Sequence, residues 1–354
     1  MVTARLRGGT AEMTALDIVF SSAHGAQHGE AELTDGIFTP CYEQPSRADR
    51  VIGELRRRGT GGVTKPHEDG IRSLETVHEQ GYLEFLETAW PRWKAKHGDR
   101  DALPLNWRAP GMRRDIVPRS IDGQLSHYSF DAGTPITAGT WEAALAAAAV
   151  AASAQALVSA GSRAALAVSR PPGHHAGRDF YGGYCYVNTA AIAVERARAA
   201  GARKVAVLDV DYHHGNGTQA VFWQEPAVFT CSLHADPRDT FPFFSGHADE
   251  TADGTNLNIP LPHGTDWQSY RPGLERALSG IAGFAPDALV VSLGVDTWEG
   301  DPISHFRFRT SDYPGLGRAI ASARLPTTFV LEGGYGLEAI GANVAGVVEG
   351  FESV

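Results

Sequence analysis

The sequence predicts a single-domain α/β fold in which a doubly wound, mostly parallel sheet is flanked by helices. Short apolar runs alternate along the chain with stretches of helical spacing, which is the element order of such sheets. Several of the runs are apolar throughout, as expected for strands that are buried on both faces. No Ser/Gly/Pro-rich linker and no internal repeat divides the 354 residues, so we expect one domain.

Six apolar runs are the expected strands. They cover residues 17–21, 164–169, 205–210, 227–233, 288–294 and 327–331. Polar or glycine-rich residues follow most of these runs. Because ligands of open α/β sheets bind at the carboxyl ends of the strands, the functional residues are expected directly after the runs.

Four helices are expected between the strands. They cover residues 141–160, 188–200, 267–281 and 311–322. Thr140 is suited to be the N-cap of the first helix, and Gly161 and Gly201 are suited to end the first and the second.

The composition is that of a globular protein with an acidic surface. Hydrophobic residues make up 43% and charged residues 20%, which excludes wholesale disorder. There are 31 Lys and Arg against 41 Asp and Glu, a formal net charge of −10. This balance argues against a nucleic-acid partner and favours a cationic or neutral substrate.

Cysteine usage and the N-terminus predict a cytoplasmic protein without a membrane partner. Cys41, Cys185 and Cys231 form no C-x-x-C pair, which argues against disulfides and suits a reducing compartment. Residues 1–15 lack the apolar segment of a signal peptide and are expected to be a flexible tail before a domain at 16–354, with Met13 as an alternative start. The apolar run 143–152 is too short to span a bilayer.

Asp211, His213 and Asp296 are a candidate metal-binding set. Asp211 and His213 follow the run 205–210 two residues apart, so their side chains point the same way. Asp296 follows another run and can converge with them. Two carboxylates and one imidazole leave a coordination position for water, which is typical of a catalytic zinc site. Taken singly, each residue could equally be a capping or turn residue.

His174 and His175 follow a Pro-Pro-Gly turn and are candidates for acid–base catalysis. Adjacent side chains alternate in direction, so both reach the site only if the turn is irregular. Asp209 can accept a hydrogen bond from one imidazole and raise its pKa, whereas Asn216 can orient the other without adding charge. The two imidazoles would then have different pKa values, as a general acid and a general base require.

Tyr335 lies in a Gly-Gly-Tyr-Gly stretch directly after a strand. The glycines permit unusual backbone angles, so the loop can swing the phenol into the site, where it would stabilise a developing oxyanion. The alternative is a tyrosine packed over a glycine turn.

Other chemistries lack their motifs. There is no G-x-S-x-G, no G-x-x-x-x-G-K-[ST] and no H-E-x-x-H. A second catalytic metal would need further carboxylates, but Gly215 and Trp298 stand at those positions. One metal is therefore expected.

Six ordered motifs resemble the zinc deacetylases of the arginase/deacetylase (histone deacetylase-like) superfamily, most closely the acetylpolyamine amidohydrolase branch. They are R-P-P-G-H-H (170–175), G-G-Y-C-Y-V-N (182–188), D-V-D-Y-H-H-G-N-G-T (209–218), S-L-H (232–234), G-V-D (294–296) and E-G-G-Y-G (332–336). Residues 81–94 and 296–304 are similar to that branch in particular. The resemblance extends from about Ile18 to the C-terminus.

The resemblance implies specific roles for residues of the site. Zn²⁺ would be bound by Asp211, His213 and Asp296, His174 and His175 would be the general acid/base pair, and Tyr335 would hold the acyl oxygen. A structural K⁺ would lie near Asp209, Ser232 and the backbone of Asp211, His213 and Leu233.

The resemblance also implies a substrate tunnel with an acidic mouth. Tyr184 and Phe241 would be its aromatic walls, and Glu32 and Asp122 would be its acidic residues. Gly133 stands where a further acidic residue would be expected, which weakens the expected selectivity for polyamines.

The same branch carries an inserted loop that pairs two subunits and narrows the entrance, and residues 88–120 match it. Trp90, Trp93 and Trp107 in this segment suit a homodimer surface. The alternative is that they cover the domain's own core.

The function implied is removal of acetyl groups from N-acetylated polyamines, namely acetylputrescine, acetylcadaverine, acetylspermidine or acetylspermine. A protein acetyl-lysine deacetylase with a wider mouth is the alternative. A non-catalytic sensor of acylated amines is a third hypothesis, but a sensor has no need of Tyr335 and both histidines together.

Overall fold

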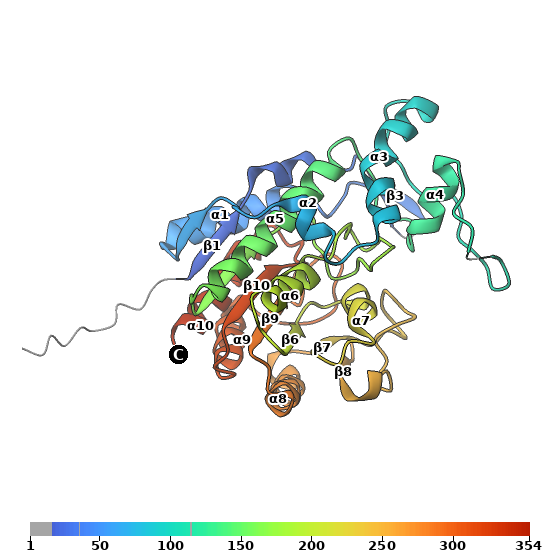
Figure 1. Cartoon of the computed structure of the whole chain (residues 1–354). Coiled ribbons are helices and arrows are strands. Elements are labelled where there is room, and N and C mark those ends of the chain that lie inside the picture. Colours follow the sequence, from blue (N-terminus) through green and yellow to red (C-terminus); the bar gives the residue numbers. More distant parts are fainter. Residues whose placement is uncertain (1–15, 35, 114) are drawn as a thin grey trace, which may run out of the picture.

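An eight-stranded sheet forms the centre of the computed structural model (Figure 1), which describes residues 16–34, 36–113 and 115–354. The strand order is β4-β1-β5-β10-β9-β6-β7-β8, and every pairing is parallel. The strands are β1 Asp17–Phe20, β4 Gly62–Thr64, β5 Ala164–Val168, β6 Val205–Asp209, β7 Val228–Ala235, β8 Asn256–Leu261, β9 Ala288–Leu293 and β10 Thr327–Leu331. The predicted fold class is confirmed.

All six expected strands are present, and the two strands of this sheet that the apolar runs did not indicate are its edges, β4 and β8. β4 has three residues, too few to form a recognisable run. β8 has the sequence NLNIPL, in which polar residues alternate with apolar ones and a proline is present. Both features are typical of an edge strand, which is paired on one side only.

Helices cover both faces of the sheet. One buried cluster joins one face to α1 Ser46–Arg58, α8 Trp267–Phe284, α9 Tyr313–Ala321 and α10 Ile340–Glu352. A second joins the other face to α2 Gly70–Leu74, α3 Gln80–His97, α4 Ile121–Tyr128, α5 Thr140–Ser159, α6 Thr189–Ala199 and α7 Asn216–Phe222. In β5, Ala165 and Ala167 belong to the second cluster and Leu166 to the first, because side chains alternate across a strand.

The remaining elements are short. They are the antiparallel hairpin of β2 Glu32–Thr34 and β3 Ile37–Thr39 and the 3₁₀ turns η1 Ser22–Ala26, η2 Ala252–Gly254 and η3 Thr310–Asp312. The expected tail, residues 1–15 with Met13, lies outside the described residues.

The four expected helices are present, with shifted ends. The N-cap of α5 is Gly139 rather than Thr140. The Thr140 hydroxyl instead accepts a hydrogen bond from the Thr137 N–H and donates one to Gln27 Oε1 at 2.6 Å. The side chain that was expected to cap the helix is therefore used in contacts with other parts of the chain. Residues 311–312 belong to η3, and α9 begins after it.

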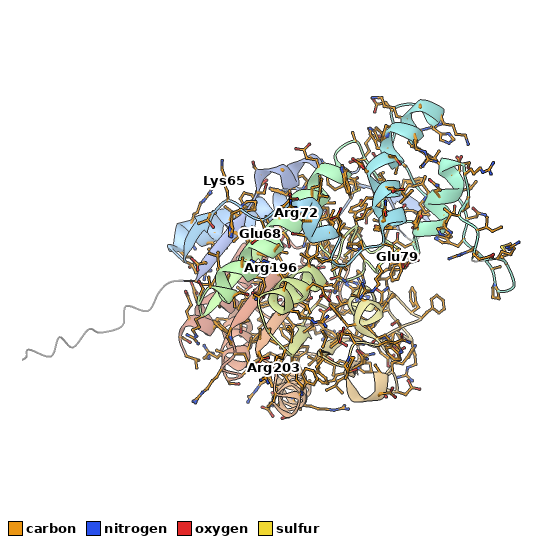
Figure 2. The ribbon with its side chains drawn as sticks, in the orientation of Figure 1. Lys65, Glu68, Arg72, Glu79, Arg196 and Arg203 are labelled. Carbon is orange, nitrogen blue, oxygen red and sulfur yellow. The ribbon has the colours of Figure 1, made fainter. Side chains whose placement is uncertain are left out.

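The helix α5 is long and apolar enough to cross a membrane, but 72% of its 18-residue apolar window is buried inside the molecule. It packs on the sheet and on α6. On the same face, Arg196 of α6 binds Glu68, which precedes α2, with 3.0 Å between Nη2 and Oε1 (Figure 2). α5 is therefore a core helix.

The segment expected to be an inserted loop is helical in its first third. Residues 88–97 belong to α3, and the described residues from there to α4 (98–113 and 115–120) form no helix or strand. Figure 1 shows α3, α4 and the connection between them standing out from the sheet. Trp90 and Trp93 are partly buried and pack against the core, which agrees with the alternative stated for them, whereas Trp107 is 40% exposed.

Candidate active site

A cavity of about 400 Å³ lies at the carboxyl ends of the central strands. Its buried end is formed by His175, His213 and Tyr335, which follow β5, β6 and β10. Its other end is formed by partly exposed side chains, among them Leu33 and Phe243. The cavity is therefore a pocket that leads from the surface to the residues that the sequence singled out.

Asp211, His213 and Asp296 converge at the buried end. Their ligand atoms all lie within 4.8 Å of one another. His213 Nδ1 is 3.1 Å from Asp296 Oδ2 and 3.4 Å from Asp211 Oδ1. The N–H of Gly333 donates to Asp211 Oδ2 at 2.7 Å, and that of Tyr212 donates to Asp296 Oδ1 at 2.9 Å, so both carboxylates are held in place by the backbone.

The charges of this set suit a divalent cation. Asp211 and Asp296 are both fully buried. Burial, followed by repulsion from Asp211, raises the pKa of Asp296 to about 7. Two buried carboxylates that repel each other gain from a cation between them, and two carboxylates with one imidazole are a donor set that zinc accepts. The residues therefore fit the metal.

His174 and His175 lie side by side with ring centroids 4.0 Å apart. His174 Nδ1 is 2.9 Å from Asp209 Oδ2, and His175 Nδ1 is 2.7 Å from Asn216 Oδ1, the pairing that the sequence suggested. Residues 169–175 form no helix or strand, and this irregular path lets both rings reach the site.

The two histidines differ in basicity. Burial opposes the charge on His174, but the carboxylates of Asp211 and Asp209 outweigh it and raise its pKa to about 10. Burial and the charges on His174 and His213 hold the pKa of His175 well below 6.5. An acceptor oxygen at Nδ1 of His175 implies that Nδ1 carries the hydrogen, so Nε2 of this neutral ring is the free base.

Tyr335 is fixed on several sides. Asp301 Oδ2 accepts hydrogen bonds from the Tyr335 N–H at 2.7 Å and from the Gly336 N–H at 3.2 Å. The Arg47 guanidinium lies 4.6 Å from the centre of the Tyr335 ring, and its Nε donates to Gly334 O at 2.6 Å. The loop that we expected to swing is thus anchored by two charged side chains.

Gly333 shows why glycine is required in this loop. A Cβ atom there would lie 2.5 Å from Asp211 Oδ2 and 2.6 Å from Asp296 Oδ2. The backbone can therefore approach both carboxylates only without a side chain.

Tyr184 and Phe241 both line the cavity. Phe241 stacks on Phe130 with centroids 5.6 Å apart and meets the His175 ring edge-on at 5.1 Å. Tyr184 has a positive φ of 64°, an uncommon conformation for a residue with a side chain. Asp131 stabilises this turn by accepting a hydrogen bond from the Gly183 N–H.

Glu32 and Asp122 do not line the cavity, which corrects the expectation that they form its mouth. Glu32 points inward from β2 and is only 1% exposed, where it accepts a hydrogen bond from the Tyr184 hydroxyl at 2.8 Å. Asp122, in the first turn of α4, forms ion pairs with Lys96 and His97 at the end of α3. Gly133, in contrast, does line the cavity.

The residues expected around a monovalent cation are close together. Asp209 of β6 pairs in register with Ser232 of β7, and Leu233 follows it in the same strand. Asp209 Oδ1 also accepts a hydrogen bond from the Asp211 N–H at 3.1 Å. Potassium at this position stays a prediction.

Sequence reasoning missed three residues that support the site: Arg47, Asp301 and Glu332. Glu332 Oε2 accepts hydrogen bonds from the N–H groups of Gly173 at 2.6 Å and His174 at 3.1 Å. It comes directly after β10, so the rule that function follows the strand ends could have found it. Asp301 lies within the motif stretch 296–304, whereas Arg47 on α1 gave no signal in the sequence.

Comparison with known proteins gives consistent matches over most of the chain. The family model described as "Histone deacetylase domain" matches residues 41–351. The chain is 48% identical to acetylpolyamine amidohydrolase 1 of Pseudomonas aeruginosa, covering 94% of this chain and 98% of that one. It is 44% identical to acetylpolyamine amidohydrolase of Mycoplana ramosa, with 94% and 98% covered.

Among solved structures, it is similar to the acetylpolyamine aminohydrolase of Burkholderia pseudomallei. The TM-score is 0.90 and the identity 36%, and the match covers 95% of this chain and 98% of the other.

Proposed function

Because the chain belongs to the histone deacetylase family, we propose that it is a zinc-dependent amidohydrolase that removes acetyl groups from N-acetylated polyamines. The observation that carries the proposal is the convergence of Asp211, His213 and Asp296 with His175 and Tyr335 at the closed end of one cavity. The names of the similar proteins support the substrate class.

Asp211, His213 and Asp296 would hold the metal through two carboxylates and one imidazole. A bound Zn²⁺ supplies Lewis acidity, which polarises an acyl carbonyl and makes water more acidic. The family implies a metal cofactor, and the identity of this metal as zinc is part of our proposal. His213 would offer Nδ1, the nitrogen that faces both carboxylates.

His175 would take the proton from the attacking water at Nε2. Its Nδ1–H is donated to Asn216, so the opposite nitrogen is free to accept. His174, held by Asp209, would remain charged and stabilise the negative charge that develops on the acyl group. The amine would then leave with a proton returned by the pair.

The Tyr335 hydroxyl would donate a hydrogen bond to the acyl oxygen. Its ring is held by Arg47 and its backbone by Asp301, so the donor is oriented before the substrate binds. A donor fixed in advance stabilises an oxyanion without reorganisation during the reaction. Tyr184 and Phe241 would contact the methylene chain.

A homodimer is the quaternary structure that we propose. Leu105, Trp107, Met112, Ile116 and Val117 between α3 and α4 are all at least 40% exposed. So many exposed apolar side chains within one short segment are typical of an interaction surface. We propose in addition that K⁺ binds at Asp209 and Ser232 and that the enzyme works in the cytoplasm, where its three free cysteines stay reduced.

An assay with acetylputrescine, acetylspermine and an acetyl-lysine peptide side by side tests the function. We expect a higher kcat/KM for the acetylpolyamines. A clear preference for the peptide would favour the protein deacetylase instead. Loss of activity on all three substrates with intact zinc binding would favour a sensor of acylated amines.

A further inference from the structure

The described residues that line the cavity include carboxylates but no lysine or arginine. Two of these residues are acidic, Asp131 and Asp239. The other ionisable ones are His175, His213, His305, Tyr184, Tyr212 and Tyr335. Among these described residues, a cationic ligand meets two carboxylates and no fixed positive side chain. Neither Glu32 nor Asp122 lines the cavity, so Asp131 and Asp239 are the carboxylates among the described lining residues from which selectivity for charge would come.

The Asp131 carboxylate is occupied by structural hydrogen bonds. It accepts from the N–H groups of Gly183 and Gly133 and from the Thr134 hydroxyl. These bonds hold the turn that carries Tyr184. A ligand could compete for this carboxylate only at the expense of the cavity wall.

The Asp239 carboxylate is open. Its side chain is exposed, and within the described residues no hydrogen bond to it is formed. The neighbouring Arg238 exerts an attraction on it, but the guanidinium of Arg238 is bound to Asp236, with 3.0 Å between Nε and Oδ1. The hydrogen-bond partner of the adjacent guanidinium is thus Asp236 and not Asp239.

Asp239 is also placed at a suitable distance from the chemistry. It lies two residues before Phe241, so the backbone from Asp239 to Phe241 spans at most about 7 Å. The Phe241 ring in turn contacts the ring of His175. Asp239 and Phe243 are exposed, whereas His175 is buried. A linear amine that enters the cavity with its acetyl group first would leave its other end beside Asp239.

We propose that Asp239 binds the distal ammonium group of the acetylated amine and is the residue that selects cationic substrates. This inference rests on the proposed function and names the residue that confers its specificity. The aromatic rings of Tyr184, Phe241 and Phe243 would contact the methylene chain between the two ends. Asp131 would keep its role in holding the wall.

The test compares N-acetylputrescine with N-pentylacetamide, in which a methyl group replaces the ammonium. The measured quantity is the ratio of kcat/KM for the charged substrate to that for the neutral one. Asp239→Asn should lower this ratio about 2- to 5-fold, as expected for one solvent-exposed charge pair, and mainly through KM. Asp239→Lys should lower it further, and Asp239→Glu should restore it.

Two further measurements make the test specific. The wild-type ratio should fall as the salt concentration rises, because salt screens exposed charges, and the Asp239→Asn ratio should not. Asp122→Asn should leave the ratio unchanged, since Asp122 is paired with Lys96 and His97.

An Asp239→Asn enzyme with the wild-type ratio overturns this inference while leaving the proposed function in place, and so does a selective loss in Asp122→Asn. A wild-type enzyme that does not hydrolyse N-acetylputrescine overturns both.

Discussion

Asp301 holds Tyr335 in place through the backbone, with 2.7 Å between Asp301 Oδ2 and the Tyr335 nitrogen. The same oxygen accepts from the Gly336 N–H, and Oδ1 accepts from the Ile303 N–H at 3.2 Å. This carboxylate therefore joins the loop that follows β10 to the segment that follows β9, which also carries Asp296. The loop that carries Tyr335 and the segment that carries Asp296 are thus joined by a single side chain.

Asp301→Ala should lower kcat by roughly 10- to 100-fold, because a displacement of about 1 Å in a catalytic group has costs of this size. KM should change little, since Asp301 does not line the cavity. Asp301→Asn retains an acceptor oxygen for one N–H and should recover part of the activity. Steady-state kinetics on acetylputrescine check the prediction, and a change confined to KM would contradict it.

Tyr335→Phe should lower kcat by roughly 10²–10³-fold if the hydroxyl is worth as much as one oxyanion donor. The ring would still pack beside Arg47, so the thermal midpoint of unfolding should stay close to that of the wild type. Near-normal turnover in this variant would exclude the proposed role. Tyr181→Phe is a suitable control, because Tyr181 is fully buried outside the cavity.

Removal of the metal with a chelator should abolish activity, and Zn²⁺, Co²⁺ or Fe²⁺ should restore it. The metal-free protein should also unfold at a lower temperature, because Asp211 and Asp296 are then two buried carboxylates without a cation between them. Calorimetry with and without metal measures this shift. An unchanged unfolding temperature would contradict the assignment of the site.

The buried His78 should make the protein less stable in mild acid. Its Nε2 accepts a hydrogen bond from the Asn188 N–H at 2.9 Å, and burial lowers its pKa to about 4. The unfolded chain binds a proton here below about pH 6.5, whereas the folded chain stays neutral until about pH 4. The free energy of unfolding should therefore decrease by up to about 3 kcal/mol as the pH falls through this window.

The pH dependence of unfolding in His78→Gln isolates this contribution, because Gln offers an oxygen as acceptor but no titration. The variant should lose less stability between pH 6.5 and pH 4 than the wild type does. His67→Gln is the matched control, since His67 is exposed. Equal slopes for wild type and His78→Gln would show that His78 does not titrate as described.

Replacing Leu105 and Ile116 together by Glu should convert the expected dimer into a monomer. Both side chains are more than half exposed, at 83% and 54%, and a buried charge at each would disfavour a dimer interface. Light scattering at micromolar concentration measures the mass. Ile71→Glu on α2 is the control, and a monomeric wild type would contradict the dimer.

The sequence predicted the site more fully than it predicted what holds the site together. Asp211, His213, Asp296 and Tyr335 were found because the carboxyl ends of parallel strands share one edge, so position after a strand was sufficient. Arg47 was missed because its contact with Gly334 joins positions 287 residues apart. No local pattern encodes such a pairing.

The two acidic residues of the expected mouth were misplaced for a related reason. Glu32 and Asp122 were matched by position in the chain, but Glu32 turned out to bind Tyr184 and Asp122 to bind Lys96. The partner of a charged side chain depends on packing between segments that are distant in the sequence. The edge strands β4 and β8 were missed for the same reason, because each is defined by its pairing with another strand rather than by its own sequence.

The last strand in the chain, β10, occupies the middle of the sheet between β5 and β9. During synthesis on the ribosome, residues 327–331 therefore emerge after all their neighbours, and until then β5 and β9 each expose an unpaired edge. Such edges are templates for association with other chains. The two open edges therefore persist until residues 327–331 have been synthesised, and Tyr335, which we propose as the oxyanion donor, follows only after them.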